Sequence, residues 1–199
     1  MSGESKDGIL LHSCCGPCSL YPLEVLKREG FTVKGYFYNP NIHPSREFLF
    51  RLEAYRDMAE HMELPAMTEE GYGLEAFMTA LKEADSAVYK AKSPERCRIC
   101  YRLRMEKAAS ACRYMGLEAF TTSLLVSPYQ NHDWIREAGE QAALSYGVAF
   151  LYRDFRPGFR QGQAKARGMR LYMQNYCGCV FSEYERYGGG KTAPEQGCG

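Results

Sequence analysis

Seven of the nine cysteines lie in three short groups whose spacing is typical of metal ligands. The groups are Cys14, Cys15 and Cys18 in HSCCGPC, Cys97 and Cys100 in CRIC, and Cys177 and Cys179 in CGC. The CxxC and CxC spacings allow two thiolates to reach one ion from a single turn of the chain. Gly178 provides the sharp backbone that the CxC chelate needs. Cys112 and Cys198 stand alone. We expect Cys112 to be a small buried side chain and Cys198 to be an unpaired thiol in the tail.

The number of clustered thiols narrows the choice of metal. One structural zinc ion takes four cysteinates, so CRIC and CGC would fill it and leave HSCCGPC without a role. A [4Fe-4S] cube also takes four thiolates, but iron–sulfur proteins accommodate a second centre nearby, and soft thiolate ligands suit both. The spacing therefore favours iron–sulfur chemistry, with a structural zinc site as the alternative. The role of Cys18 as a metal ligand stays open, because its side chain could face into the first turn of a following helix.

The composition is that of a soluble globular protein. The 199 residues are 45% hydrophobic and 25% charged, so we expect one domain over residues 1–187. Residues 188–199 (GGGKTAPEQGCG) are Gly-rich and polar, which predicts a disordered tail. No targeting segment begins the chain and no stretch approaches the ~18 apolar residues of a membrane span, so we expect a cytoplasmic protein without a membrane partner. In that reducing compartment, an odd number of clustered cysteines fits metal or redox chemistry better than disulfides.

Hydrophobic periodicity predicts alternating strands and helices along the chain. Strands are expected at residues 8–13, 32–38, 65–68, 119–125 and 148–152, and helices at 20–30, 44–62, 74–81, 102–115, 134–146 and 163–174. Such alternation is typical of an α/β fold, in which helices cover both faces of a parallel sheet in three layers. Ligands of such sheets bind at the carboxyl ends of the strands. HSCCGPC follows the first predicted strand, CRIC precedes a helix and CGC lies in a turn after one.

Positive charge is concentrated in two segments, although the net charge is only +1. Residues 90–107 contain seven Lys or Arg and two Glu, and residues 153–170 contain six Lys or Arg and one Asp, so each segment carries +5. One face that binds a polyanion explains this asymmetry. The alternative is two solvated helices with surplus charge. Because both segments adjoin cysteines, we expect Arg156, Arg167 and Arg170 to bind phosphates beside the metal.

Two polar loops follow predicted strands. YNPNIHP contributes Tyr38, Asn39 and Asn41, and TTSLLVSPYQN contributes Ser127 and Tyr129. Loops at the carboxyl edge of a parallel sheet are where a ligand lies, so substrate contact is one interpretation of these side chains. Asn, Ser and Pro also form turns, which is the other interpretation.

Six motifs, taken in order, resemble the QueH type of epoxyqueuosine reductase. They are HSCCGPCS, FYNPNIHP, ERCRICYRLRMEKAA, TTSLLVSPYQN, YRDFRPGF and YMQNYCGCVFSE, and the resemblance runs from about Ile9 to Tyr187. It implies a nucleotide α-hydrolase (HUP)-like fold, whose members usually carry an SGGxDS pyrophosphate loop after the first strand. SCCGPCS stands there in this sequence, so we expect a metal-binding loop in that place and no ATP pyrophosphatase chemistry.

An enzyme of this type reduces the epoxide of epoxyqueuosine in tRNA to the alkene of queuosine, the last step of queuosine biosynthesis. The resemblance implies a [4Fe-4S] cluster and an adjacent iron ion in place of cobalamin. These metals would supply the one-electron donor and the Lewis acid that reductive cleavage of a carbon–oxygen bond needs. The modified base lies in the anticodon loop, where unpaired bases and dense phosphates suit a cationic rim. The external electron donor is not identified by the sequence.

The motifs and the resemblance together give each candidate a role. The residues expected to bind a cofactor are Cys14, Cys97, Cys100, Cys177 and Cys179. Cys15 and Asp154 are expected to be catalytic and to bind metal, and the sequence leaves open which cysteines hold the cluster and which hold the second iron. Asp154 is expected on the second iron, where a hard carboxylate keeps the metal Lewis acidic. For Asp154, an ion pair with Arg153 or Arg156 is the alternative.

Two other functions compete with this interpretation. A non-catalytic RNA-binding zinc module would have one closed four-cysteine site and the same basic face. A thiol oxidoreductase would use one CxxC pair and leave the other thiol groups idle. The metal content of the purified protein distinguishes these two functions from the reductase.

Overall fold

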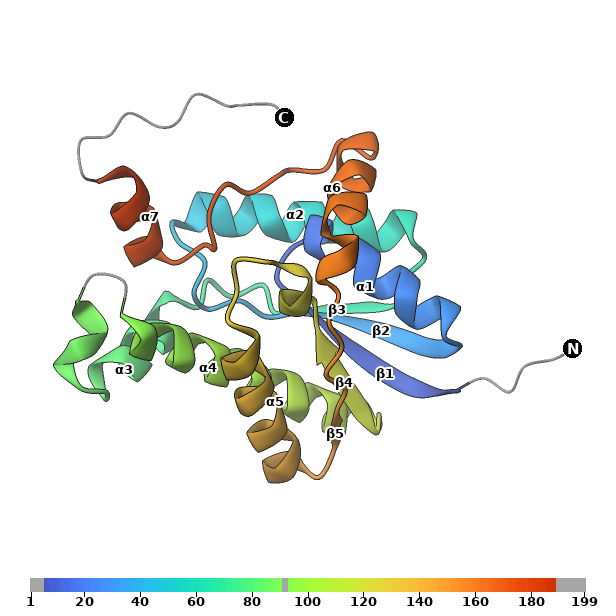
Figure 1. Ribbon diagram of the computed structural model, residues 1–199, viewed down its shortest axis with the longest axis horizontal. Coiled ribbons are helices and arrows are strands. Elements are labelled where there is room, and N and C mark those ends of the chain that lie inside the picture. The colour runs from blue at the N-terminus through green and yellow to red at the C-terminus, as the bar shows by residue number, and fades with distance from the viewer. Residues whose placement is uncertain (1–5, 91–92, 189–199) are drawn as a thin grey trace, which may run out of the picture.

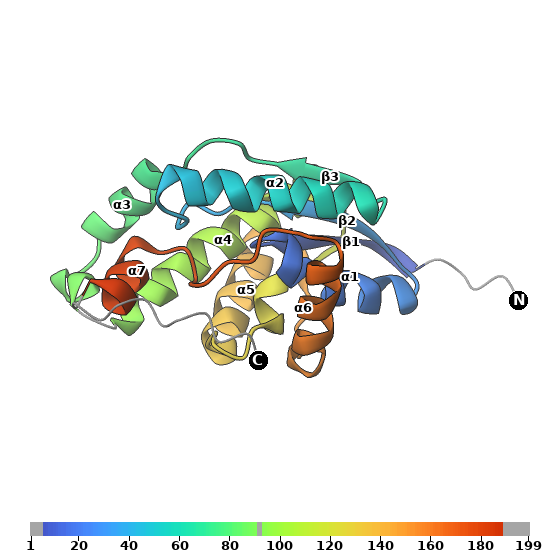
Figure 2. The same ribbon diagram turned by 90° about the horizontal axis from the view of Figure 1, so that it is seen from above.

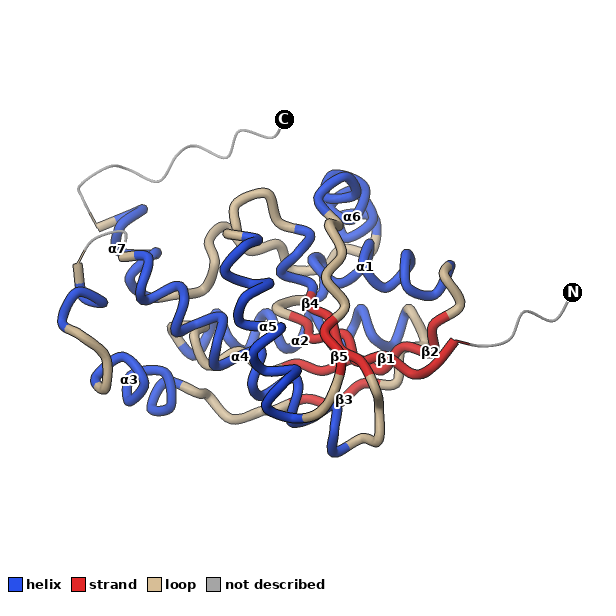
Figure 3. The backbone as a smooth tube through the Cα atoms, turned by 60° about the horizontal axis from the view of Figure 1, so that its bottom comes forward, coloured by secondary structure: helices blue, strands red, loops and turns tan. Residues whose placement is uncertain are grey.

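The computed structural model describes residues 6–90 and 93–188, and its strands form one parallel sheet (Figure 3). The strand order is β3-β2-β1-β4-β5. The strands are β1 (Lys6–Ser13), β2 (Phe31–Phe37), β3 (Ala66–Thr68), β4 (Ala119–Thr122) and β5 (Ala149–Phe150). The helices are α1 (Gly16–Arg28), α2 (Ser45–His61), α3 (Leu74–Lys82), α4 (Pro94–Tyr114), α5 (His132–Tyr146), α6 (Phe159–Gly168) and α7 (Val180–Tyr187). The predicted tail, apart from Gly188, lies outside the described residues.

Helices cover both faces of the sheet. In Figure 1, α1, α2 and α6 lie above the strands, and α4 and α5 lie below them. α1 packs against α2 and α6, whereas α4 packs against α5. The predicted three-layer α/β fold is therefore confirmed. None of the helices in the described segments is both long and apolar enough to cross a membrane.

β1 is the central strand because its side chains are apolar on both faces. Ile9, Leu10 and Leu11 are fully buried, as expected for a strand that is covered on both sides. β2 and β4 pair with β1 on its two edges, with Gly35 and Thr121 opposite Leu11. The carboxyl ends of β1 and β4 therefore flank the switch point of the sheet, where α/β proteins bind ligands. HSCCGPC begins at this point.

Three predicted element boundaries near the cysteines are wrong. CRIC lies inside α4 and not before it, because Pro94, which is tolerated in a first turn, already begins the helix. The helix predicted at 163–174 is α6 at 159–168, and the chain leaves it through Arg170 in the left-handed conformation (φ 56°). CGC consequently follows an irregular segment and no helix. The strand predicted at 119–125 ends at Thr122 and continues as a 3-10 helix, η2 (Ser123–Val126).

A second, smaller hydrophobic cluster brings CRIC and CGC together. Phe77 and Leu81 of α3 pack with Val88, with Cys100 of α4 and with Cys179, which immediately precedes α7. α3, the start of α4 and α7 lie at the same end of the molecule in Figures 1 and 2. No element was expected from the sequence where α7 lies. Apolar packing thus unites two cysteine motifs that are far apart in the chain.

α1 and α2 approach each other closely at Gly16. A Cβ atom on Gly16 would lie 2.2 Å from the backbone oxygen of Ala54 in α2. Backbone cannot move aside as a flexible side chain can, so the crossing requires glycine. The contact holds the start of α1, and with it the HSCCGPC loop, against α2.

We expect Gly16→Ala to lower the free energy of unfolding by about 1–3 kcal/mol, the usual cost of overpacking a filled interior. Urea unfolding of the metal-free protein measures this change. Gly168→Ala is the matched control, because Gly168 is also helical and a Cβ atom there meets nothing within 4 Å. Equal stability of Gly16→Ala and the wild type would show that α1 and α2 separate easily.

Candidate metal centre

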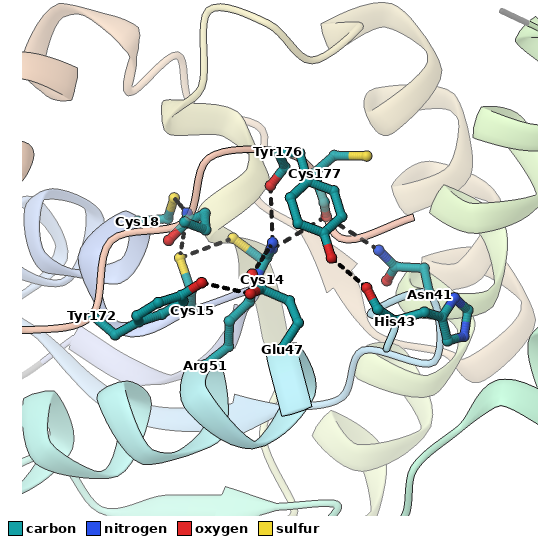
Figure 4. Close-up of polar contacts among 11 residues, drawn as sticks. Cys14, Cys15, Cys18, Asn41, His43, Glu47, Arg51, Tyr172, Tyr176 and Cys177 are labelled. Atoms are coloured by element: carbon teal, nitrogen blue, oxygen red, sulfur yellow. Dashed lines mark hydrogen bonds and ion pairs between the residues drawn. The ribbon is translucent and has the colours of Figure 1, made fainter. Parts of the chain in front are cut away.

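Three sulfur atoms gather where β1 ends and α1 begins. The Sγ atoms of Cys14, Cys15 and Cys18 all lie within 4.8 Å of one another, and those of Cys14 and Cys15 are 3.8 Å apart (Figure 4). All three side chains are buried. Cys15 caps α1 and Cys18 lies in its first turn. Cys18, which the sequence leaves open, therefore belongs to this group, which we call the cysteine trio.

The spacing of the cysteine trio suits a single metal ion. Two thiolates on one tetrahedral ion, with metal–sulfur bonds of about 2.3 Å, lie about 3.8 Å apart. The Cys14 and Cys15 sulfurs have this separation. The Cys18 sulfur lies within 4.8 Å of both, so it can reach the same ion as a third ligand and leave one position for a further ligand.

Polar side chains from distant segments donate hydrogen bonds to these sulfurs. The Ser123 hydroxyl, just after β4, donates to Cys14 Sγ (3.3 Å) and accepts from the Cys14 backbone N–H (3.0 Å). The Gln174 Nε2 group donates to Cys15 Sγ (2.9 Å) and to Cys18 Sγ (3.2 Å). Gln174 belongs to the segment between α6 and α7, which passes beside the start of α1 in Figure 2. Such donors favour thiolates over thiols.

Burial and hydrogen bonding act in opposite directions on the trio. Hydrogen bonds from Cys15 and Cys18 hold the pKa of the Cys14 thiol well below its ordinary value. Burial raises the pKa of Cys15 above its ordinary value. The trio therefore carries one thiolate readily, and a bound cation is needed to stabilise the others.

The other four clustered thiols form a looser group, which we call the cysteine tetrad. Its members are Cys97, Cys100, Cys177 and Cys179. Cys100 and Cys179 are buried, whereas Cys97 and Cys177 are exposed. Burial raises the pKa of Cys100 to about 12 and that of Cys179 to about 11, and neighbouring thiols of the tetrad add to both shifts. Within the described segments, no three of these sulfurs lie within 4.8 Å of one another.

The loop after β2 ties the trio to the tetrad. The Asn39 amide donates to the carbonyl of Ser13, directly before Cys14 (2.9 Å). The Asn41 amide donates to the Cys177 carbonyl (3.4 Å). Both asparagines are buried. These contacts give the two side chains a structural role, and their contact with substrate stays a prediction.

The CGC turn packs directly on this loop. The His43 backbone N–H donates to the Gly178 carbonyl (2.8 Å), and the Tyr176 hydroxyl donates to the His43 carbonyl. Gly178 has a φ of 101°, and a Cβ atom there would lie 2.8 Å from Ile42 Cγ1. The glycine of CGC is therefore needed for its conformation, as the sequence predicts, and for the close approach of the loop.

A buried arginine locks the CGC turn to α2. Arg51 is 2% exposed. Its guanidinium donates to Glu47 Oε1 (2.7 Å), to the Tyr176 carbonyl (2.9 Å) and to the Cys177 carbonyl (3.2 Å) (Figure 4). The Tyr172 hydroxyl donates to the second oxygen of Glu47 (2.5 Å). The charges and hydrogen bonds of this buried ion pair are thus satisfied, as burial requires.

Arg104 is a second buried cation, and its neighbours are thiols. It is 4% exposed, its Nε donates to the Cys100 carbonyl (3.3 Å) and its guanidinium lies over the Tyr101 ring. Its charge favours the ionised form of Cys100 in the tetrad and of Cys14 in the trio. A cation near both groups stabilises the negative charge that thiolates bring.

Comparison with known proteins assigns the chain to a family. Residues 9–185 match the family model described as "Epoxyqueuosine reductase QueH". The chain belongs to the QueH family. The epoxyqueuosine reductase QueH of Dehalococcoides mccartyi is 38% identical over 181 residues, which are 90% of this chain and 94% of the relative. The Thermotoga maritima protein of the same name is 35% identical over 187 residues, which are 89% of this chain and 91% of the relative.

The solved structures support the fold of this QueH family member and nothing further. A crystal structure of a deacetylase from the biosynthesis pathway of teicoplanin aligns with a TM-score of 0.50. The identity is 12%, and the alignment covers 81% of this chain and 83% of the other. Similarity at that level of identity reflects shared architecture, so chemistry must be argued from the site.

Asp154 lies in an ion pair at the surface of this QueH family member. Its two oxygens accept hydrogen bonds from the Arg156 guanidinium (2.8 and 2.7 Å), which lower the pKa of Asp154 to about 2. The carboxylate is not part of the sulfur group around Cys15. The ion pair that the sequence offers as an alternative is therefore present, and ligation of iron by Asp154 stays a prediction.

The remaining predicted substrate contacts lie at the surface or in turns. Tyr129 is 85% exposed, and the Ser127 hydroxyl accepts the Tyr129 backbone N–H (3.2 Å). Tyr38 is half-buried, and Arg167 and Arg170 are exposed. Contact of these residues with substrate stays a prediction.

The two isolated cysteines lie outside the metal centre. Cys112 is buried, and its thiol faces the carbonyls of Leu117 (3.3 Å) and Ala119 (3.2 Å). The expectation of a small buried side chain at Cys112 is confirmed. Cys198 lies outside the described residues.

Sequence reasoning missed the side chains that support the thiols. They are Glu47, Arg51, Arg104, Ser123 and Gln174. Ser123 lies near the end of the strand predicted at 119–125 and within TTSLLVSPYQN, so its place at the carboxyl edge of the sheet could have been found. Arg51 interrupts the apolar run FLFRL of a predicted helix, which is a signal for a buried partner. Gln174 lies in the motif YMQNYCGCVFSE, but nothing in the spacing of that motif shows that the side chain reaches the trio, because only the path of the chain brings it there.

We expect Arg51→Met to lower the free energy of unfolding by about 3–5 kcal/mol, because Glu47 would be left buried and unpaired and two carbonyls would lose their donors. Urea unfolding of the metal-free protein measures the change. Arg136→Met is the matched control, since Arg136 forms an exposed i,i+4 pair with Glu140 and should matter little.

The double variant Arg51→Met/Glu47→Leu distinguishes the cost of an unpaired buried charge from the cost of the lost hydrogen bonds to the two carbonyls. It removes both buried charges, so it should recover part of the stability that Arg51→Met loses. If Arg51→Met alone is as stable as Arg136→Met, the buried pair does not hold the CGC turn.

Proposed function

We propose that this chain reduces the epoxide of epoxyqueuosine in tRNA to the alkene of queuosine, the activity for which its QueH relatives are named. Both carbon–oxygen bonds of the epoxide break, a carbon–carbon double bond forms, and the oxygen leaves as water. The reaction consumes two protons and two electrons, which a low-potential one-electron donor must supply. The cysteine trio carries this proposal, because no ordinary side chain donates single electrons and buried sulfurs at the switch point suit a redox metal.

The donor set fits iron centres. We assign a [4Fe-4S] cluster to the cysteine tetrad and a single iron ion to the trio. The thiolates of a cube bind different iron atoms, so they are spread more widely than thiolates on one ion, which agrees with the looser tetrad. This assignment moves Cys14 from the cluster, where the sequence led us to expect it, to the single ion. When bound, the cluster supplies single electrons and the iron ion supplies a Lewis acid.

The chain's own residues prepare this site for negative charge. Burial of the trio excludes water, which strengthens every electrostatic interaction inside it. Arg51 and Arg104 supply fixed positive charge, and Ser123 supplies a donor at Cys14. The loop over residues 38–44 fixes the trio relative to the tetrad, so metals held by the two groups would lie at a constant separation.

We assign the anticodon loop of the tRNA to the surface beside α6. Arg167 and Arg170 are exposed there, and the chain continues from them to the trio at Gln174. Phosphates bound by the two arginines would bring an unpaired base toward the trio. Tyr129, which packs edge-on against Phe159 at the start of α6, offers an exposed ring for stacking.

Anaerobic reconstitution with iron and sulfide should give a brown protein that holds more than about four iron atoms per chain, with the broad absorbance of an iron–sulfur cluster. Reduced by dithionite, it should convert epoxyqueuosine tRNA to queuosine tRNA, measured by mass spectrometry of the nucleosides. Cys15→Ser should lose about one iron and nearly all turnover but keep the cluster absorbance. Cys100→Ser should lose that absorbance, whereas Cys112→Ser, the matched control, should lose neither.

The same measurements separate the competing assignments. A colourless protein with one zinc ion and no sulfide would identify a zinc module. Full iron content without conversion of epoxyqueuosine would overturn the proposed substrate and leave the assignment of the metals unchanged. Asp154→Ala should lose about one iron if Asp154 is a ligand, and full iron with near-normal turnover would make Asp154 only the partner of Arg156.

Binding of the tRNA should weaken steeply with salt, by roughly 0.7–0.9 logarithmic units in affinity per logarithmic unit of salt for each phosphate contact. Arg167→Gln and Arg170→Gln should each lower that slope by about one contact and leave the iron content unchanged. Arg113→Gln is the matched control, because Arg113 is exposed at the opposite, amino edge of β4 and β5. A slope that neither variant changes would place the RNA on another face.

A further inference from the structure

Gln174 lies outside the three cysteine motifs, yet its side chain contacts two sulfurs of the trio. Its Nε2 group is 2.9 Å from Cys15 Sγ and 3.2 Å from Cys18 Sγ. Its Oε1 atom is buried and has no hydrogen-bond partner in the described part of the chain. The amide therefore donates to the sulfurs and leaves its acceptor unsatisfied. A buried unsatisfied acceptor costs free energy, which the two hydrogen bonds to sulfur must offset.

The orientation of the amide follows from the state of the sulfurs. Metal-bound thiolates carry no proton, so they accept hydrogen bonds and cannot donate them. Only the Nε2 end of Gln174 can face such sulfurs, and Oε1 must then point away from them. The observed arrangement is thus the one that a metal-loaded trio requires.

Two anchored tyrosines hold Gln174 in place. The Tyr172 hydroxyl donates to Glu47 in α2, and the Tyr176 hydroxyl donates to the His43 carbonyl in the loop after β2. Each tyrosine is two residues from Gln174, so the chain on both sides of the amide is attached to the scaffold. A donor that is fixed in this way does not need to be ordered when a metal binds.

We propose that Gln174 is a positioning residue for the metal of the cysteine trio, whose amide holds the Cys15 and Cys18 thiolates in place and withdraws electron density from their sulfurs. The inference rests on the proposed function, because it requires the trio to bind a metal. Hydrogen bonds to ligand sulfurs stabilise the more electron-rich state of a metal centre and raise its reduction potential. Gln174 therefore favours the reduced form of the trio metal.

Titration of the metal-free protein with Co²⁺ alone tests this inference through the thiolate-to-cobalt charge-transfer absorbance. The Cys15→Ser variant identifies the binding phase that belongs to the trio. Gln174→Leu should weaken that phase about 10- to 100-fold, as loss of a hydrogen-bond partner of a metal ligand typically does. Its charge-transfer band should move to lower energy, because a sulfur without its hydrogen bond gives up electron density more easily. The phase of the tetrad should not change.

Gln141→Leu is the matched control, because Gln141 is an exposed glutamine in α5. Unchanged affinity and an unchanged band in Gln174→Leu would overturn the inference and leave the proposed function intact. Equal weakening of both phases, with a lower free energy of unfolding, would overturn it in favour of a purely structural role. If no wild-type phase responds to Cys15→Ser, the trio binds no metal, and the metal assignment fails together with this inference.

Gln174→Met is a second variant in case the leucine variant does not fold. It keeps the length of the side chain and removes the N–H donors. It should show the same weakening and the same shift of the band, and wild-type behaviour would overturn the inference.

Discussion

Thiolates that share a small buried space repel each other and lose their hydration. The side chains around the cysteine trio are arranged to reduce both costs. Two unit charges 4 Å apart interact by about 4 kcal/mol at an effective dielectric of 20, and desolvation adds to the repulsion. Ser123 and Gln174 offset part of it as hydrogen-bond donors to the three sulfurs. Arg51 and Arg104 contribute positive charge. If all three thiols ionise, the remaining repulsion requires a further cation, which a bound metal ion would supply.

The buried ion pair of Arg51 and Glu47 has a separate role, although apolar side chains could have filled its space. Arg51 and Glu47 contribute little stability compared with well-packed hydrophobic side chains, because both charges must be desolvated. Their value lies in the donors that Arg51 directs at the Tyr176 and Cys177 carbonyls. An apolar residue could fill the space but could not hold these carbonyls. The ion pair therefore sets the path of the CGC turn.

The two thiol groups depend on different parts of the fold. The trio is built on the sheet, since HSCCGPC follows β1, Ser123 follows β4 and the loop over residues 38–44 follows β2. The tetrad is built on helices, in the small cluster of α3, α4 and the start of α7. Asn41 and Arg51 connect the two through the Cys177 carbonyl. The two thiol groups are thus held by separate scaffolds at a fixed separation.

The sequence by itself determined the features that depend on local pattern. The three cysteine motifs, the alternation of strands and helices, and the need for Gly178 all follow from residue spacing over a few positions. These patterns were enough for the layered α/β fold and for the placement of HSCCGPC at the carboxyl end of the first strand. They also indicated the family, because the motifs are specific and occur in order.

Only the tertiary structure decided which side chains meet. Strand order and the return of the chain from β3 to β4 place Ser123 beside Cys14, and the path after α6 places Gln174 on Cys15. No local period encodes such distances, because they depend on how the whole sheet is wound and which faces the helices bury. For the same reason the sequence could not choose between Arg156 and a metal as the partner of Asp154. The pairing with Arg156 is a contact of neighbours in the chain, whereas ligation depends on a distance across the fold.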